Sequence, residues 1–214
     1  MRKSFLAMFL MLLATDPAVA QTGKRVALGA ALGVSSYIDK DFSSTNPSIQ
    51  PAYRVRLSTE TKDGWSWALK SGFGWSSRKT SSDIGGESTR LGKLQTILIM
   101  GGVQRVFRQG LWQFGGGIVA GPSINKFNVD RAARDAYQRR LGQVLDDVKV
   151  KTSIAVRPGV SVSYDLGKWF GVEGGVSYTF NRPKAETSVD GTTTSSTWKT
   201  DHTSASVGLV VGLF

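Results

Sequence analysis

The sequence predicts an all-β protein: an eight-stranded antiparallel up-and-down transmembrane β-barrel, with one helix in its third long connection. Three observations predict this fold. Segments of strand length alternate apolar and polar residues with a period of two. The connections between these segments are alternately long and short. The polar faces consist mainly of glycine, alanine and serine, which suit the crowded interior of a narrow barrel.

The first residues have the three parts of a secretory signal peptide. Met1-Arg2-Lys3 is positively charged, residues 5–14 are apolar, and Ala18-Val19-Ala20 is a small-x-small cleavage pattern. The apolar stretch is too short for a helix of about 20 residues that could span a bilayer. We therefore expect residues 1–20 to be removed, and residues 21–214 to form a single barrel domain.

Composition excludes several kinds of site. The chain has no cysteine, which excludes disulfides and thiolate metal sites, and a single histidine, His202, which excludes a multi-histidine metal site. No phosphate-binding glycine loop is present, so we expect no cofactor. The formal net charge of +11 does not indicate nucleic acid as a partner, because a signal peptide takes the chain out of the cytoplasm.

The strands differ in how clearly the alternation of residues separates an apolar face from a polar one. In the third strand, large apolar residues alternate with small ones from Trp65 to Ser76. The fourth is apolar on both faces around residues 97–100, and a bulge at Gly101-Gly102 that swaps the faces would explain this. The eighth is also ambiguous, because both of its faces carry apolar residues. We place the strands near 24–36, 48–59, 64–77, 91–107, 111–122, 152–165, 168–181 and 201–214.

The direction of the apolar face distinguishes two kinds of barrel. A soluble barrel directs large apolar groups inward and long charged groups outward. Here the bulky aromatic face opposes a face of small residues, so the aromatic face is the outer one, and only lipid tolerates it there. Strands can cross a membrane only as a closed barrel, because lipid cannot satisfy free strand edges.

The lengths of the connections predict how the barrel is oriented. The long connections are 37–47, 78–90, 123–151 and 182–200, and the short ones are 60–63, 108–110 and 166–167. Four long and three short connections are expected when both ends of an even-stranded barrel lie in the periplasm. Aromatic residues that resemble an interfacial girdle collect at the short end: Trp65, Trp67, Phe107, Trp112, Tyr164, Trp169 and Phe170.

These features together resemble the small outer-membrane β-barrel proteins of Gram-negative bacteria, of the OmpA/OmpX type. The resemblance is architectural and covers essentially all of residues 21–214. In that family the last strand ends in an aromatic residue that the barrel-assembly machinery recognises, so the resemblance implies that Phe214 is an assembly signal. Gly208 and Gly212, on the face of Phe214, depart from the family pattern and leave the facing of this strand open. We expect a location in the cell outer membrane.

Five charged residues lie on the small-residue faces and are therefore expected inside the barrel: Arg54, Arg56, Lys70, Arg157 and Glu173. A charge in such an interior needs a partner or water. We expect Glu173 to pair across the lumen with one or more of the bases, which would form a plug. The alternative is a narrow channel that favours anions. We prefer the plug, because eight-stranded barrels have room for side chains and little else.

The third long connection has the pattern of an amphipathic helix over residues 130–148. Asp130 is the expected N-cap, and an apolar stripe runs from Ala133 to Val148. Gly142 weakens this helix by about 1 kcal/mol relative to alanine. The helix would cap the barrel mouth, rest on the outer leaflet through its basic face, or bind a partner. The expected lipopolysaccharide contacts are Arg78, Lys79, Arg90, Arg134, Arg139 and Arg140.

The expected function is that of a non-enzymatic outer-membrane barrel with a structural or surface-interaction role and an extracellular ligand that the sequence does not identify. A less favoured alternative is a lipid A-modifying hydrolase. His202 and Ser204 share a face, as in the His-x-Ser pair of outer-membrane lipid A deacylases. Asp201 points the other way, so a triad would need an acid from elsewhere, and the extended motif of those enzymes is missing. A polar barrel rim is the simpler interpretation of these residues.

Overall fold

A computed structural model of the chain describes residues 26–38, 45–56, 64–166 and 170–212, and the side chains of Ala27 and of residues 45–56 lie outside this description. The signal peptide, Trp169 and Phe214 also lie outside the described residues. The barrel strands are β1 (Val26–Tyr37), β2 (Thr45–Arg56), β3 (Trp65–Ile84), β4 (Glu87–Gln109), β5 (Trp112–Val129), β7 (Ser153–Asp165), β8 (Phe170–Asn181) and β11 (His202–Gly212).

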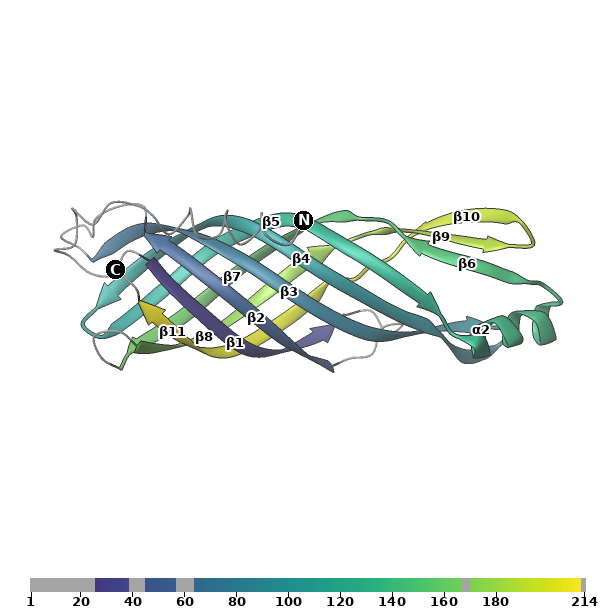
Figure 1. The fold of residues 1–214 in the computed structure, drawn as a ribbon, viewed down its shortest axis with the longest axis horizontal. Coiled ribbons are helices and arrows are strands. Elements are labelled where there is room, and N and C mark those ends of the chain that lie inside the picture. The colour runs from purple at the N-terminus through teal and green to yellow at the C-terminus, as the bar shows by residue number, and fades with distance from the viewer. Residues whose placement is uncertain (1–25, 39–44, 57–63, 167–169, 213–214) are drawn as a thin grey trace, which may run out of the picture.

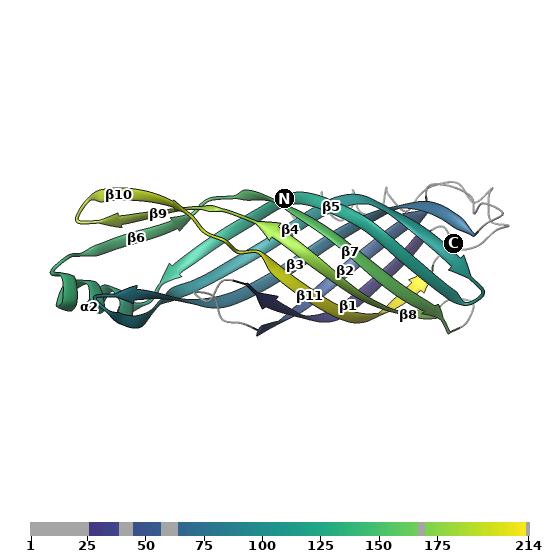
Figure 2. The same cartoon turned by 180° about the vertical axis from the view of Figure 1, so that it is seen from behind.

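Among the described residues, these eight strands close into one barrel in the order β1-β2-β3-β4-β5-β7-β8-β11, and β11 pairs with β1 to complete the ring. Neighbouring strands are antiparallel and follow one another along the chain, as in an up-and-down barrel. Figure 1 shows the tilted strands as one cylinder, with a smaller sheet and a helix projecting beyond one end. Figure 2 shows the other side of the same cylinder, where β8 and β11 are seen in front.

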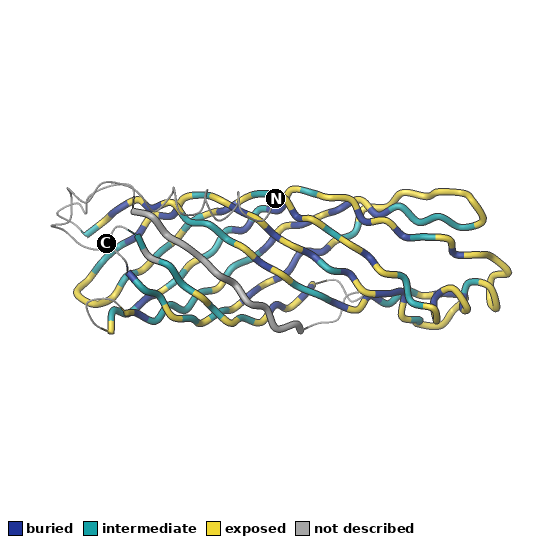
Figure 3. Tube along the Cα trace, in the orientation of Figure 1, coloured by how far each residue is buried: buried dark blue, intermediate teal, exposed yellow. Residues whose placement is uncertain are grey.

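The barrel wall is apolar outside and small or polar inside. Along β3 and β4 buried and exposed residues alternate over most of each strand, and Figure 3 shows this alternation around the barrel. The exposed members include Trp67, Phe73 and Trp75, whereas Ser66 and Ala68 are buried. A period-2 strand with its large apolar side outward is the arrangement expected where the surroundings are hydrocarbon.

The structure settles the facing of the fourth and eighth strands. Leu98 and Met100 are buried inside, and Ile97 and Ile99 are exposed outside, so both faces of β4 are apolar. The register between β3 and β4 is unchanged across Gly101-Gly102, so the suggested bulge at that pair is wrong. The register shift lies instead between Thr80 and Ser81. In β11, Val207 and Leu209 are the exposed face.

The second long connection, expected at 78–90, is a continuation of the barrel strands. β3 and β4 extend as a hairpin and meet at Gly85-Gly86, where φ is +62° and +86°. Two consecutive residues with positive φ form the tight turn whose twist matches paired strands, and glycine adopts it without steric cost. The expected loop at 78–90 is therefore wrong, because a hairpin needs only this pair of glycines to turn.

The third and fourth long connections, expected at 123–151 and 182–200, form a cap beyond one end of the barrel. It contains helix α2 (Arg131–Ala136), one turn of π-helix, η2 (Tyr137–Leu141), and three strands, β6 (Leu145–Val150), β9 (Lys184–Val189) and β10 (Thr192–Thr197). The strands form a separate sheet in the order β10-β9-β6. Figure 1 shows this sheet and α2 on the same side of the molecule, opposite the short connections.

The helix expected over 130–148 is shorter than predicted. Asp130 occupies the N-cap position, but its side chain makes no capping hydrogen bond. Gly142 ends the helical segment with φ +66°, in the left-handed conformation typical of a helix C-terminus. Leu145 and Val148 then lie in β6 and not on a helix. Their spacing fits either structure, and pairing with β9 determines which one forms.

The expected loop at 182–200 is likewise mostly a hairpin. β9 and β10 pair along their whole length and are joined by Asp190-Gly191, with φ +48° and +72°. An Asp-Gly pair between two strand-like segments is a recognised signal for such a turn. The cap is tied together by backbone amides that donate to carboxylates of the facing segment: Val144 N to Asp190 Oδ1 at 2.9 Å and Gly191 N to Asp146 Oδ2 at 3.0 Å.

One apolar cluster joins the cap to the barrel. It contains Tyr37, Ile84, Leu91, Leu94 and Phe127 from the barrel strands, and Ala133, Ala136, Leu145, Val148, Val150 and Ala185 from the cap and the chain leading into it. β1 and β5, which carry Tyr37 and Phe127, are four places apart in the ring of eight described strands. The cluster therefore contains residues from opposite sides of the barrel at the end where the cap lies.

Candidate functional site: the lumen and the charged surfaces

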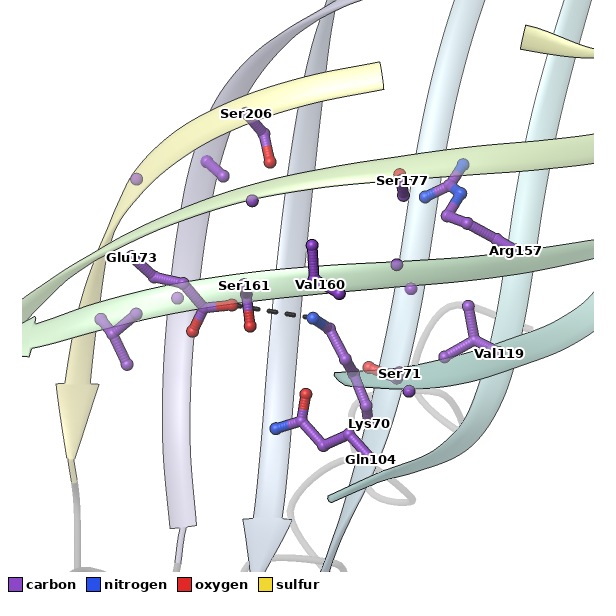
Figure 4. A pocket seen from close by; sticks show the side chains of 18 of the residues that line it. Lys70, Ser71, Gln104, Val119, Arg157, Val160, Ser161, Glu173, Ser177 and Ser206 are labelled. Atoms are coloured by element: carbon purple, nitrogen blue, oxygen red, sulfur yellow. Dashed lines mark ion pairs between the residues drawn. The ribbon is translucent and has the colours of Figure 1, made fainter. Parts of the chain in front are cut away.

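An ion pair crosses the lumen below this cluster. Lys70 Nζ on β3 lies 3.7 Å from Glu173 Oε1 on β8, as Figure 4 shows. β3 and β8 are four places apart in the ring of described strands, so the pair joins opposite walls. The side chains are 31% and 24% exposed, which places the charges in a partly solvated interior. Such a pair gains little stability in itself but leaves a costly lone charge if one partner is removed.

Arg157 of β7 fills the next level of the lumen. Its Nε donates to Thr179 Oγ1 at 2.9 Å, and both residues are buried. Its guanidinium lies against the part of β3 where Gly72 and Gly74 have no side chain: a Cβ added there would be 3.8 Å and 3.7 Å from the terminal nitrogens of Arg157. The small residues of β3 thus provide the space that the long side chain from β7 occupies.

The lumen retains a cavity of about 120 Å³ beside these side chains. Lys70, Gln104, Arg157 and Glu173 line it, together with small residues such as Ser161 (Figure 4). A volume of this size holds a few water molecules. Arg54 and Arg56 were expected in the same lumen. Their backbone pairs with Lys70 and Ala68, but their side chains lie outside the described residues.

Arg78 does not lie on the surface, where it was expected. The residue is 2% exposed, and its guanidinium carbon lies 3.8 Å from the centre of the Tyr37 ring. The expected contact of Arg78 with lipopolysaccharide does not fit this burial. The physical reason is the continued strand: Ser76, Arg78 and Thr80 follow one another on the inner face of β3, because the strand does not end at residue 77.

The other predicted contact residues are accessible, and most of them hold the cap in place. Arg90 Nε lies 2.8 Å from Asp130 Oδ2, and Arg140 binds Glu87, the Ile84 carbonyl oxygen and Thr89 of the β3–β4 hairpin. The other two predicted contact residues of the helical segment donate to backbone carbonyl oxygens: Arg134 to Asp146 and Arg139 to Asp135.

Lys79 differs from these arginines because it faces outward from the barrel wall. It pairs directly with Lys93 across β3 and β4, and both are exposed. Lys126, on β5, is also exposed. It pairs with Gln95 of β4, which lies on the same strand face as Lys93 and two residues after it. No ion pair of these three lysines occurs among the described residues. Sequence reasoning missed Lys126 because the fifth strand was expected to end at residue 122.

We call Lys79, Lys93 and Lys126 the lysine cluster. It lies just beyond the last row of large outward apolar residues on these strands, formed by Trp75, Ile97 and Ile124. Like charges placed directly opposite each other in a sheet destabilise it unless an anion compensates them. The cluster therefore has the charge and the position of a binding surface for anionic groups at the edge of the apolar band.

The histidine and serine considered for hydrolysis are buried in the barrel interior. His202 and Ser204 are 4% and 3% exposed. Ser204 Oγ shares a hydrogen bond with Ser35 Oγ at 3.0 Å, and His202 Nδ1 lies 3.1 Å from the Thr200 carbonyl oxygen. Asp201 accepts from the Asn181 amide and pairs with Arg182. No hydrogen bond joins His202 to Ser204 among the described residues, so the geometry does not form a nucleophile–base pair.

Aromatic side chains form a continuous series at the short-connection end, on four neighbouring strands. Ring centres are 5.1 Å apart for Trp65 and Phe107, 6.4 Å for Phe107 and Phe114, 6.5 Å for Phe114 and Trp112, and 4.7 Å for Trp112 and Tyr164. Trp112 is 48% exposed.

Among the described residues, no helix is both long enough and apolar enough to cross a bilayer.

No protein-family model and no curated protein sequence matches the chain. Solved structures do match it. The outer-membrane protein OprG from Pseudomonas aeruginosa superposes with a TM-score of 0.68 at 13% identity, over 92% of this chain and 98% of OprG. The outer-membrane protein AlkL, solved in lipid bilayers, gives a TM-score of 0.52 at 14% identity, over 92% of this chain and 93% of AlkL. The chain therefore has the fold of the small outer-membrane β-barrel proteins, as its sequence predicts.

Proposed function

We propose that this chain is a non-enzymatic, eight-stranded outer-membrane β-barrel with a closed lumen, whose cap forms a contact surface outside the cell. The observation that carries the proposal is the apolar cluster that joins Tyr37 of β1 to Phe127 of β5 through the cap. A cluster of this kind across a barrel mouth favours a contact surface over a pore, because it excludes water from the path that a solute would take.

The outer surface of the cap supports this role. All six residues of β10 are exposed, and all are threonine or serine. β10 is an edge strand of the cap sheet, so one row of its backbone groups has no partner within that sheet. An edge strand offers backbone hydrogen bonds to an extended segment of another protein. An extracellular protein ligand would thus meet a polar surface held by the apolar cluster beneath it.

Single-channel recording in planar bilayers tests the closed lumen. We expect no steady conductance from the folded protein. The combined variant Lys70→Ala and Arg157→Ala should also not conduct, because the apolar cluster forms a second barrier. Conducting events should appear only when the cap is loosened as well. Steady steps from the unmodified protein would overturn the proposal.

The alternative is a small channel that favours anions, and one observation supports it. Lys70 and Arg157 face the lumen cavity, whereas Glu173 is the single acidic residue among the described residues that line it. An opened lumen would therefore attract anions. If steady steps appear with anion selectivity, this alternative replaces the closed barrel.

We further propose that lipopolysaccharide is the partner of the lysine cluster. Lipopolysaccharide carries phosphate groups where the apolar band ends, and unpaired ammonium groups at that level are complementary to them. Lys79 thereby keeps the role expected from the sequence, and Lys93 and Lys126 join it. The barrel-assembly machinery is the other proposed partner, through Phe214, which lies outside the described residues.

The proposed orientation places both termini in the periplasm and the cap outside. The chain has no cysteine, so a single cysteine reports the side of the membrane on which it lies. Thr194→Cys in the cap should react with a membrane-impermeant maleimide on intact cells. Gln109→Cys at the short-connection end should react only after the outer membrane is permeabilised. The opposite pattern would reverse the orientation.

A further inference from the structure

Arg105 is an outward-facing charge within the aromatic series at the short-connection end. It lies on β4, four residues before the strand ends at Gln109, and it is exposed. Its guanidinium carbon lies 4.5 Å from the centre of the Trp65 ring and 6.0 Å from that of Trp67. The two rings hold the guanidinium on the outer wall of the barrel.

No carboxylate or carbonyl oxygen partners Arg105 among the described residues: its contacts there are the two tryptophan rings. Arg108, by contrast, lies on the face of β4 that carries the buried Gln104 and Val106, and it has Asp165 at 3.1 Å. A guanidinium without an anion is costly to place beside hydrocarbon, and the side chain reaches toward the interface to lower this cost. Arg105 therefore has a structural requirement for an anion that the described chain does not supply.

A hollow in the outer wall adjoins Arg105. Its volume is about 770 Å³, and its lining includes Trp65, Phe107, Phe114, Val160 and Gly116. Gly116 pairs directly with Arg105 across β4 and β5, on the same face of the sheet. A Cβ added to Gly116 would meet nothing within 4 Å, so the absence of a side chain opens the space next to the guanidinium.

We propose that Arg105, Trp65 and Gly116 form a binding site for a glycerophospholipid with a net negative head group. The guanidinium binds the lipid phosphate, and Trp65 and Trp67 hold it at the level of the head groups. An acyl chain lies over Gly116 along the apolar hollow. Arginine suits this ligand because its planar set of donors matches phosphate oxygens. The site is separate from the lysine cluster, which lies toward the cap. It rests on the proposed membrane insertion of the barrel.

Tryptophan quenching by brominated lipids tests the site. The protein is placed in nanodiscs of equal parts phosphatidylcholine and phosphatidylglycerol, and only one of the two carries brominated chains. We expect brominated phosphatidylglycerol to quench more strongly, with a preference of about fivefold, from roughly 1 kcal/mol per basic residue at a membrane surface. Arg105→Gln should remove the preference, and Arg105→Lys should retain part of it.

Matched variants locate the effect. Gly116→Leu fills the hollow and should reduce the preference, whereas Gly101→Leu adds the same side chain to the outer face of β4, at a position equally free of neighbours, and should not. Lys149→Gln, at an exposed position of the cap sheet, should also have no effect. Equal quenching by both lipids, or a preference that survives Arg105→Gln, would overturn the site. Heat-dependent electrophoretic migration reports folding and insertion separately, so an inserted protein without lipid preference contradicts this inference alone.

Discussion

Lys70 Nζ lies 3.7 Å from Glu173 Oε1, and the two strands that carry these residues lie on opposite sides of the barrel. The pair thus connects opposite walls of the barrel across the lumen. The walls around it consist of small residues, including Gly72, Ser161 and Gly175, so the two long side chains meet without obstruction. The sequence predicts this pairing because Glu173 is the one acidic residue among the expected inward charges.

Removing one charge of this ion pair should destabilise the barrel. Lys70→Gln and Glu173→Gln should each lower the free energy of unfolding by about 1–2 kcal/mol, less than for a fully buried pair because both groups keep some solvent. Urea unfolding in micelles, followed by tryptophan fluorescence, measures this change. The exchanged variant Lys70→Glu with Glu173→Lys should recover most of the loss. If the exchanged variant is no better than the single variants, the two charges do not act as a pair.

The cap should unfold separately from the barrel when the apolar cluster beneath it is weakened. Leu145 is 1% exposed, and Leu145→Ala should lower the stability of the cap by about 2–4 kcal/mol through loss of buried surface and the cavity left behind. Trypsin should then cut the cap at Arg131, Arg134 or Arg139 while the barrel stays intact. Leu141→Ala is the matched control, because Leu141 is 45% exposed. Equal resistance of the two variants to trypsin would show that the cluster does not hold the cap.

The lysine cluster should show opposite effects on stability and on binding. Lys79→Gln with Lys93→Gln removes a repulsion between directly paired like charges, so stability without lipopolysaccharide should rise by about 0.2–1 kcal/mol. Affinity for lipopolysaccharide in micelles should fall about 25-fold, because two ammonium groups no longer face the phosphates and each contributes about 1 kcal/mol. Lys149→Gln with Lys184→Gln changes the same charge on exposed cap positions and should leave affinity unchanged. Equal losses in both double variants would indicate a general charge effect.

The sequence allowed the outward apolar face and the lumen pair to be predicted, because both depend on the period of two within each strand. It did not reveal how much of the chain beyond the barrel forms strands. The Gly85-Gly86 and Asp190-Gly191 turns were visible as residue pairs, yet the polar segments around them read as loops. Beyond the bilayer a strand no longer needs an apolar outer face, so hydropathy ceases to mark it.

The same limit explains the two errors at the candidate site. Arg78 is buried and Lys126 lies on the outer wall because β3 and β5 run past residues 77 and 122, where the apolar pattern fades. The helix prediction over residues 130–148 was wrong beyond Leu141, because an apolar spacing that suits a helix also suits a strand with a bulge. Which one forms depends on β9, a partner more than 30 residues away in the chain.

The central claim is that the large apolar residues of the barrel face hydrocarbon, and β4 tests it most directly. Single cysteines from Ile97 to Val103, each carrying a nitroxide label in reconstituted bilayers, report contact with oxygen in lipid and with a nickel chelate in water. We predict high oxygen and low nickel contact at Ile97, Ile99 and Val103, and low values of both at Leu98 and Met100. Strong nickel contact at Ile97, Ile99 and Val103 would place that face in water and contradict the account.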